Sequence, residues 1–172
     1  MPGVLGGGNG CGGQVFARFR PSDSAVTLPR VDEWITTAER LLTEPYAETV
    51  THRADGIAEP GLHVAYLMTS QDFYDEDDHE VAEPVLREYE AARDGLVAAL
   101  TERWGAAERI DLGEILDSSM RGHAPTPLTA YLCNVAGGAA PLWRRGDRHV
   151  SVVVAWEDQE LPIVLTLAVG RH

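Results

Sequence analysis

The sequence predicts an α+β fold, in which an antiparallel sheet ends in a three-stranded C-terminal meander and two main helices pack on one face of the sheet. Two observations point to the helices, because apolar residues recur with helical spacing over 30–43 and over 80–104. A third observation points to the meander: the last third of the chain holds three apolar segments separated by turn residues, at 142–145, 148–156 and 163–169.

The first helix is expected to end before Pro45, and its apolar face consists of Val31, Trp34, Ile35, Ala38, Leu41 and Leu42. Two extended segments follow, near 48–52 and 62–68. Asp55-Gly56 and Pro60-Gly61 predict turns between them. The second segment alternates in the manner of a half-buried strand, with one face formed by Leu62, Val64, Tyr66 and Met68.

The helix over 80–104 is the longest predicted element, and Gly105 is suited to the left-handed conformation that ends a helix. Its buried stripe is formed by Val85, Tyr89, Ala92, Leu96, Leu100 and Trp104. Beyond it we expect a short strand at 110–112 and a loop through Pro125. Thr126 followed by Pro127 is typical of an N-cap with proline in the first turn, and it predicts a short helix through Leu132.

In the meander, Gly146-Asp147 fits a tight hairpin turn. One face of the middle strand carries Val150, Val152, Val154 and Trp156, and one face of the last strand carries Ile163, Leu165, Leu167 and Val169. Val153 falls on the opposite face, where we expect a polar residue to be tolerated unless a second layer covers it.

We expect one domain over 25–172, preceded by a flexible glycine-rich tail over 1–24, because seven of the first 13 residues are glycine. Gly8, Gly10 and Gly13 match the G-x-G-x-x-G dinucleotide fingerprint. That fingerprint requires a strand before it and a helix after it, and the flanking residues predict neither. No cofactor is therefore predicted.

Charge is the strongest compositional feature, with 14 basic residues, all arginine, against 27 acidic ones and a net charge of −13. This charge repels nucleic-acid phosphate and anionic lipid, so neither nucleic acid nor membrane is an expected partner. The richest apolar stretch, 150–156, is far shorter than a membrane span. Cys11 and Cys133 form no metal or redox motif. These features predict a soluble, cytoplasmic protein.

Between Asp72 and Glu90 the chain holds nine acids and one base. One interpretation is a docking face for a basic partner protein, formed by Asp75, Glu76, Asp77, Asp78 and Glu80. Another is a divalent-metal site formed by Asp75, Asp77, His79 and Glu83. The simplest is a set of solvated acids that oppose the helix dipole at the start of the long helix.

A second candidate contact surface lies beside the hairpin turn, where Trp143 is followed by Arg144 and Arg145. Tryptophan and arginine together are typical of interface hot spots, although we expect all four tryptophans to lie chiefly in or beside the core. The six histidines show no metal-binding spacing, and the chain has no G-x-S-x-G motif. No catalytic or metal-binding residue is therefore predicted.

These observations favour a non-enzymatic, acidic protein-binding domain that masks or escorts a basic protein partner. Immunity proteins and secretion chaperones have this general character, and the analogy rests on size, charge and missing catalytic motifs. One alternative is a metal-dependent hydrolase built on Asp75, Asp77, His79 and Glu83. The other is a structural subunit that assembles through a strand edge. The sequence does not predict an oligomeric state.

Overall fold

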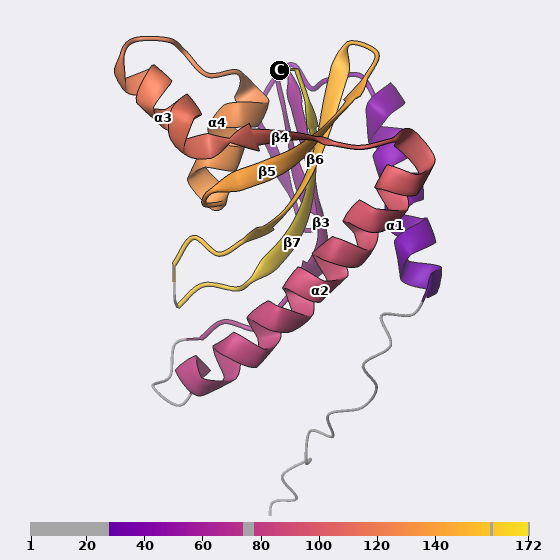
Figure 1. Cartoon of the computed structure of the whole chain (residues 1–172), viewed down its shortest axis with the longest axis vertical. Helices are drawn as coiled ribbons and strands as arrows, with labels where there is room; N and C mark the ends of the chain where they lie inside the picture. The colour runs from indigo at the N-terminus through magenta and orange to yellow at the C-terminus, as the bar shows by residue number, and fades with distance from the viewer. Residues whose placement is uncertain (1–27, 74–77, 159, 172) are drawn as a thin grey trace, which may run out of the picture.

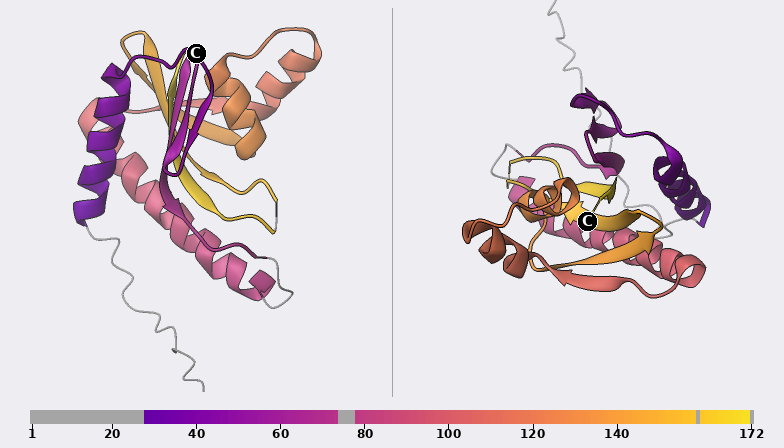
Figure 2. Two further views of the ribbon diagram at one scale, coloured as in Figure 1. Left: turned by 180° about the vertical axis from the view of Figure 1, so that it is seen from behind. Right: turned by 90° about the horizontal axis from the view of Figure 1, so that it is seen from above.

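The computed structural model describes residues 28–73, 78–158 and 160–171. In this part of the chain a seven-stranded antiparallel sheet lies between two layers of helices (Figures 1 and 2). The helices are α1 (Leu28–Thr43), α2 (Asp78–Trp104), α3 (Leu112–Met120) and α4 (Pro127–Val135). The strands are β1 (Thr51–Arg53), β2 (Gly56–Glu59), β3 (Leu62–Thr69), β4 (Glu108–Asp111), β5 (Ala139–Arg145), β6 (Arg148–Ala155) and β7 (Val164–Gly170).

The sheet order is β1-β2-β3-β7-β6-β5-β4, so the predicted meander β5-β6-β7 is confirmed. The last strand of the meander pairs with β3, which joins the N-terminal hairpins to the C-terminal third. The α+β prediction with two main helices on one face is also confirmed. The expected tail over 1–24 lies outside the described residues.

One face of the sheet is covered by α1 and α2, and the apolar stripes predicted for both helices lie in this core. Leu96 and Leu100 are 0% exposed. Full burial of a leucine side chain stabilises a fold by roughly 1.5–3 kcal/mol, so these contacts hold α2 to the sheet. Beneath the helices lie Val150 and Val152 of β6, Leu165, Leu167 and Val169 of β7, and Ile163 directly before β7, which confirms the predicted faces of the last two strands.

The other face is covered by α3 and α4. The expected loop through Pro125 was wrong for its first half, because α3 occupies 112–120. The Asp111 carboxylate caps this helix by accepting hydrogen bonds from the Gly113 and Glu114 amides. The helix after Thr126 is confirmed and extends to Val135. Because this second layer covers the sheet, Val153 is only 5% exposed.

Two details of the N-terminal strands also differ from expectation. Gly56 begins β2 instead of lying in a turn, and a Cβ there would come within 1.9 Å of the Val64 carbonyl oxygen. In β3 a bulge between Tyr66 and Met68 reverses the alternation. Met68 consequently packs under α1 and α2, while Tyr66 stays on the face covered by α3 and α4.

Val153→Thr tests the second helical layer. The substitution places a hydroxyl on the face of the sheet that α3 and α4 cover. We expect a loss of about 1–3 kcal/mol in the free energy of unfolding, measured by urea denaturation. Val154→Thr is the matched control, because Val154 is half-buried on the other face and should lose less than about 0.5 kcal/mol. Equal losses in the two variants would contradict the burial of Val153 under a second layer.

Candidate functional site

β5 changes its hydrogen-bonding partner along its length. Its first four residues, 139–142, pair with β4, and its last three, 143–145, pair with β6. The ladder between β5 and β6 ends at the Trp143–Val150 pair. From there β6 continues to Ala155 beside β7 alone.

Pro141 explains why the ladder ends at this point. Gly146 and Asp147 form a two-residue turn between β5 and β6, so Arg145 and Arg148, which flank the turn, form a hydrogen-bonded pair. In an antiparallel ladder such pairs recur at every second position. Trp143 and Val150 form the next hydrogen-bonded pair in the series. The pair after that would join Pro141 to Val152, but proline has no backbone N–H to donate to the Val152 carbonyl.

Hydrogen bonds on the outer sides of β5 and β6, where each strand faces its other neighbour, agree with this alternation of hydrogen-bonded pairs. The Thr166 hydroxyl donates to the Val153 carbonyl at 3.3 Å, so that carbonyl faces β7 and the backbone groups of Val154 face the other way. On β5, the register with β4 turns the backbone groups of Ala139 and Pro141 away from β4. Both strands therefore direct backbone polar groups into the space between them.

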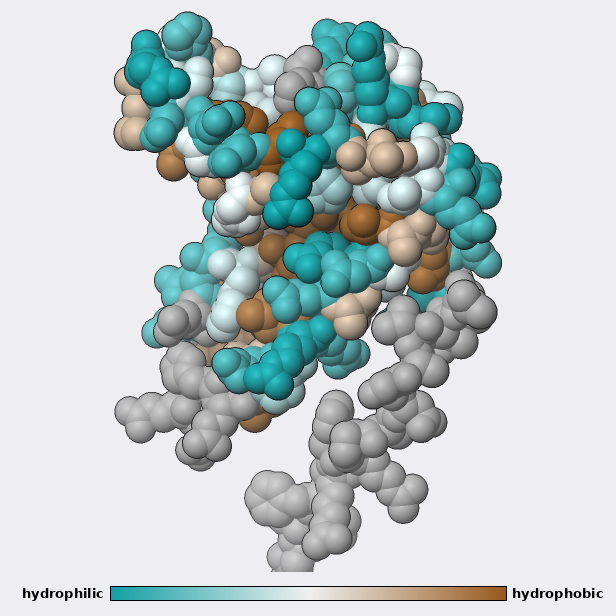
Figure 3. All heavy atoms as spheres, in the orientation of Figure 1, coloured by the Kyte–Doolittle hydropathy of each residue, from teal (hydrophilic) through white to brown (hydrophobic). Residues whose placement is uncertain are grey.

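A cleft of about 560 Å³ occupies this space between β5, β6 and α2. In Figure 1 the two strands separate below their hairpin, and Figure 3 shows hydrophobic atoms between α2 and the β4 region above it. Partly exposed apolar residues of the lining include Leu86, Val97, Ala107, Pro141, Val154 and Trp156. The cleft thus combines apolar and polar surface, and its volume lies in the range of ligand-binding sites.

Charged side chains surround the apolar lining. Arg93 and Asp94 of α2 pair with each other, with 2.9 Å between the guanidinium and the carboxylate. Among the residues that the structure describes, Glu90, Glu108 and Arg109 form no ion pair. Three carboxylates and two guanidiniums leave the cleft with a charge of −1.

The described lining contains carboxylates, guanidiniums and apolar groups, but no histidine, cysteine, serine, threonine or tyrosine. The residues that could contact a ligand come from 86–97, 107–109, 136–141 and 152–156, which lie far apart in the sequence. Sequence reasoning missed this cleft, and its one local indication was a proline directly before a predicted strand.

The side chains of the predicted acidic docking face lie outside the described part of the structure. Asp75, Glu76 and Asp77 lie outside the described residues, and the described part of Asp78 and Glu80 is the backbone of the first turn of α2. Further along α2, Glu83 is exposed and pairs with Arg87 at 2.8 Å, and Glu90 reaches the cleft.

The metal-site hypothesis stays untested at its main residues. Asp75 and Asp77 lie outside the described part of the chain, as does the side chain of His79. Glu83 is the one proposed ligand whose side chain is described, and it is engaged with Arg87. Within the described residues, no group of three or more His, Cys, Asp or Glu side chains lies close enough to hold a metal ion.

The second predicted contact surface divides between core and exterior. Trp143 is 2% exposed, donates its indole N–H to the Gly105 carbonyl at 3.0 Å and packs edge-on against Trp104. The core interpretation therefore holds for Trp143. Arg144 and Arg145 are exposed, and the Arg145 guanidinium lies 5.2 Å from the centre of the Trp104 ring. Any contact with a partner at this surface would be made by Arg144 and Arg145.

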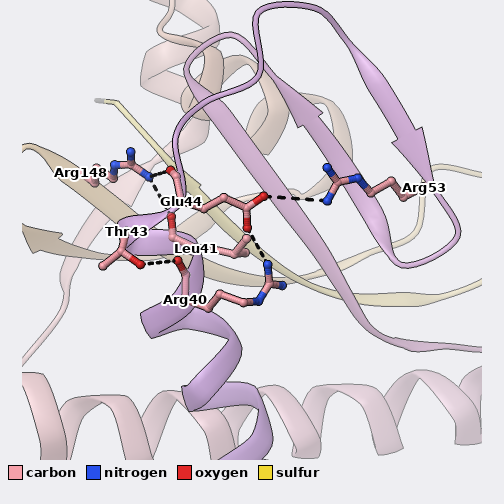
Figure 4. Close-up of polar contacts among 6 residues, drawn as sticks. All are labelled: Arg40, Leu41, Thr43, Glu44, Arg53 and Arg148. Carbon is pink, nitrogen blue, oxygen red and sulfur yellow. Dashed lines mark hydrogen bonds and ion pairs between the residues drawn. The ribbon is translucent and has the colours of Figure 1, made fainter.

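A second polar cluster lies at the end of α1 (Figure 4). Arg148 at the start of β6 donates to the carbonyls of Leu41 and Glu44 at 2.8 and 2.7 Å. These carbonyls lie at the helix C-terminus, where a cation also interacts favourably with the helix dipole. The guanidinium lies 4.1 Å from the centre of the Tyr46 ring, which stacks on His63. Arg148 thus joins α1 to the central sheet.

His63 is buried beneath this cluster, with 2% of its surface exposed. Burial lowers the pKa of the His63 imidazole below its usual value of 6.5. The Glu44 carboxylate opposes this shift and the positive charge of Arg148 adds to it. The neutral imidazole is therefore the form that the fold favours.

Comparison with known proteins adds no family to this description: no family model, no curated protein and no solved structure matches the chain. None of the helices in the described residues is long and apolar enough to cross a membrane.

His63 should make the stability of the fold depend on pH. Because its folded-state pKa is lowered, the unfolded chain binds more protons as the pH falls below 6.5, and the free energy of unfolding falls with it. Chemical denaturation of the natural protein and of His63→Phe between pH 7.5 and about 5 measures this contribution. The variant should lose stability less steeply over this range, and identical slopes would contradict the neutral, buried imidazole.

Proposed function

We propose that the chain is a protein-binding domain that takes an extended, basic segment of a partner protein into the cleft between α2, β5 and β6. The observation that carries this proposal is the end of the β5–β6 ladder at Pro141. It leaves inward-facing backbone groups at Ala139 and Val154 beside an apolar surface. An extended peptide offers the matching backbone donors and acceptors, as in recognition by strand addition.

The side chains of the cleft support the same class of ligand. Apolar side chains of a bound segment would pack against Leu86, Val97 and Trp156. Basic side chains would meet Glu108 of β4 and Glu90, which lies on the same face of α2 as Leu86 and Val97. Neither carboxylate forms an ion pair within the described residues.

The net charge of −13 supports a basic partner over an acidic one. Charge of one sign attracts an oppositely charged partner over distances up to about a Debye length and raises the rate of association. Arg93 and Asp94 neutralise each other at the cleft, so the carboxylates of Glu90 and Glu108 outweigh Arg109 there.

The outer edges of the sheet give little support to assembly through a strand edge. β1 has three residues, all exposed, and β4 has four, three of them exposed and charged. Short, charged edge strands are a common protection against pairing with another sheet. The metal-dependent hydrolase stays untested, because Asp75, Asp77 and the His79 side chain lie outside the described residues. No contact within the described residues supports it.

Affinity capture from the native host tests the proposal with a matched pair of variants. Val97→Glu places a charge in the apolar lining of the cleft, and Leu116→Glu places the same charge on α3, where Leu116 is 53% exposed and outside the cleft lining. We expect the partner retained by the natural protein and by Leu116→Glu to be lost from Val97→Glu, and its binding to weaken at high salt. Circular dichroism establishes that both variants fold.

Retention of every captured protein by a folded Val97→Glu variant would overturn the proposal. Equal loss from both variants would overturn it as well, because binding would then not depend on the cleft.

A further inference from the structure

We propose that this chain supplies an occupant of its own cleft: residues 15–20, Val-Phe-Ala-Arg-Phe-Arg, bind between α2, β5 and β6 within the same molecule. The inference rests on the proposed function, since it names a ligand for the same cleft. These residues lie outside the described part of the chain, so their sequence and the lining of the cleft carry the inference.

Residues 15–20 combine apolar and basic side chains. In an extended conformation Val15, Ala17 and Phe19 would lie on one side, and Phe16, Arg18 and Arg20 on the other. The segment has no acidic residue, although the chain as a whole carries a charge of −13. It is therefore a short, basic and apolar segment within a strongly acidic protein.

The lining offers partners for both kinds of side chain in this segment. Leu86, Val97 and Trp156 present partly exposed apolar surface, which the phenylalanines of the segment would contact. The carboxylates of Glu90 and Glu108 form no ion pair within the described residues, so they are available to arginine. Arginine and carboxylate can form two parallel hydrogen bonds, which adds geometric specificity to the attraction.

The connection to α1 is long enough for this contact within one chain. Arg30, in the first turn of α1, lies close enough to Tyr89 of α2 to affect the pKa of its hydroxyl. Glu90 follows Tyr89 directly and lines the cleft on the neighbouring flank of α2. Residues 21–27 therefore have to pass around one helix, α2, and a helix is about 10–12 Å in diameter. The seven residues 21–27 span up to about 24 Å when extended.

Self-occupancy has a consequence for the proposed partner. A tethered segment is present near the cleft at an effective concentration in the millimolar range. An external basic segment then has to displace it, and the apparent affinity for the partner falls by the fraction of molecules whose cleft is already filled. Residues 15–20 would act as a built-in competitor.

Disulfide formation in the full chain tests the contact. Cys11 and Cys133 are first replaced by serine, and Ala17→Cys is combined with Val154→Cys in the cleft or with Leu116→Cys on α3 as the matched control. We expect the first pair to form an intramolecular disulfide about tenfold faster than the control pair under the same oxidant. Phe19→Ser in the first pair should slow the reaction, because it removes an apolar contact. Peptide mapping of the monomer identifies the bond.

Equal rates for the Val154 and Leu116 pairs would overturn the inference, as would a disulfide that forms only between two chains. The outcome is separate from that of partner capture. If the disulfide rates are equal while Val97→Glu still loses the captured protein, the cleft binds a partner and not its own segment. If the Val154 pair reacts rapidly while Val97→Glu retains every captured protein, the self-contact stands and the partner proposal fails.

Discussion

The backbone N–H that Pro141 lacks determines how the C-terminal half of the structure is arranged. β5 can follow β6 only as far as the Trp143–Val150 pair, because the next hydrogen bond of the ladder has no donor. The first half of β5 pairs with β4 instead. This exchange of partners separates β4 from the central strands, and α3 begins directly after β4 at Leu112. The cleft is the space that remains between the diverging strands and α2.

The rest of the fold holds this open region in place. The central strands β3, β7 and β6 are buried on both faces by separate helical layers, and their ladders are continuous apart from the bulge in β3. Arg148 binds the last carbonyls of α1 through side chain-to-backbone hydrogen bonds that connect residues 104 and 107 positions apart. Hydrogen bonds from a charged donor contribute about 1.5–3 kcal/mol. The cleft thus borders a central sheet that is buried on both faces.

The helices α1 and α2 and the last three strands could be predicted from the sequence because their evidence is local. A stripe such as Tyr89, Ala92 and Leu96 shows the helical period within a few turns. α3 could not be found this way, because Leu112 and Ile115 are its inward-facing apolar residues, while Leu116 and Met120 are exposed. The cleft could not be predicted at all. Its walls come from four separate segments between residues 86 and 156, and only the position of Pro141 indicates that a strand pairing stops.

The most direct test of the role of Pro141 is a through-hydrogen-bond scalar coupling measured by NMR in the Pro141→Ala variant. The new alanine amide would lie opposite the Val152 carbonyl in the register of the existing ladder. If the missing donor is what ends the ladder, the spectrum will show a coupling between the amide nitrogen of residue 141 and the carbonyl carbon of Val152. If that coupling is absent while the Trp143–Val150 couplings persist, the strands separate for another reason, and Pro141 does not determine where the ladder ends.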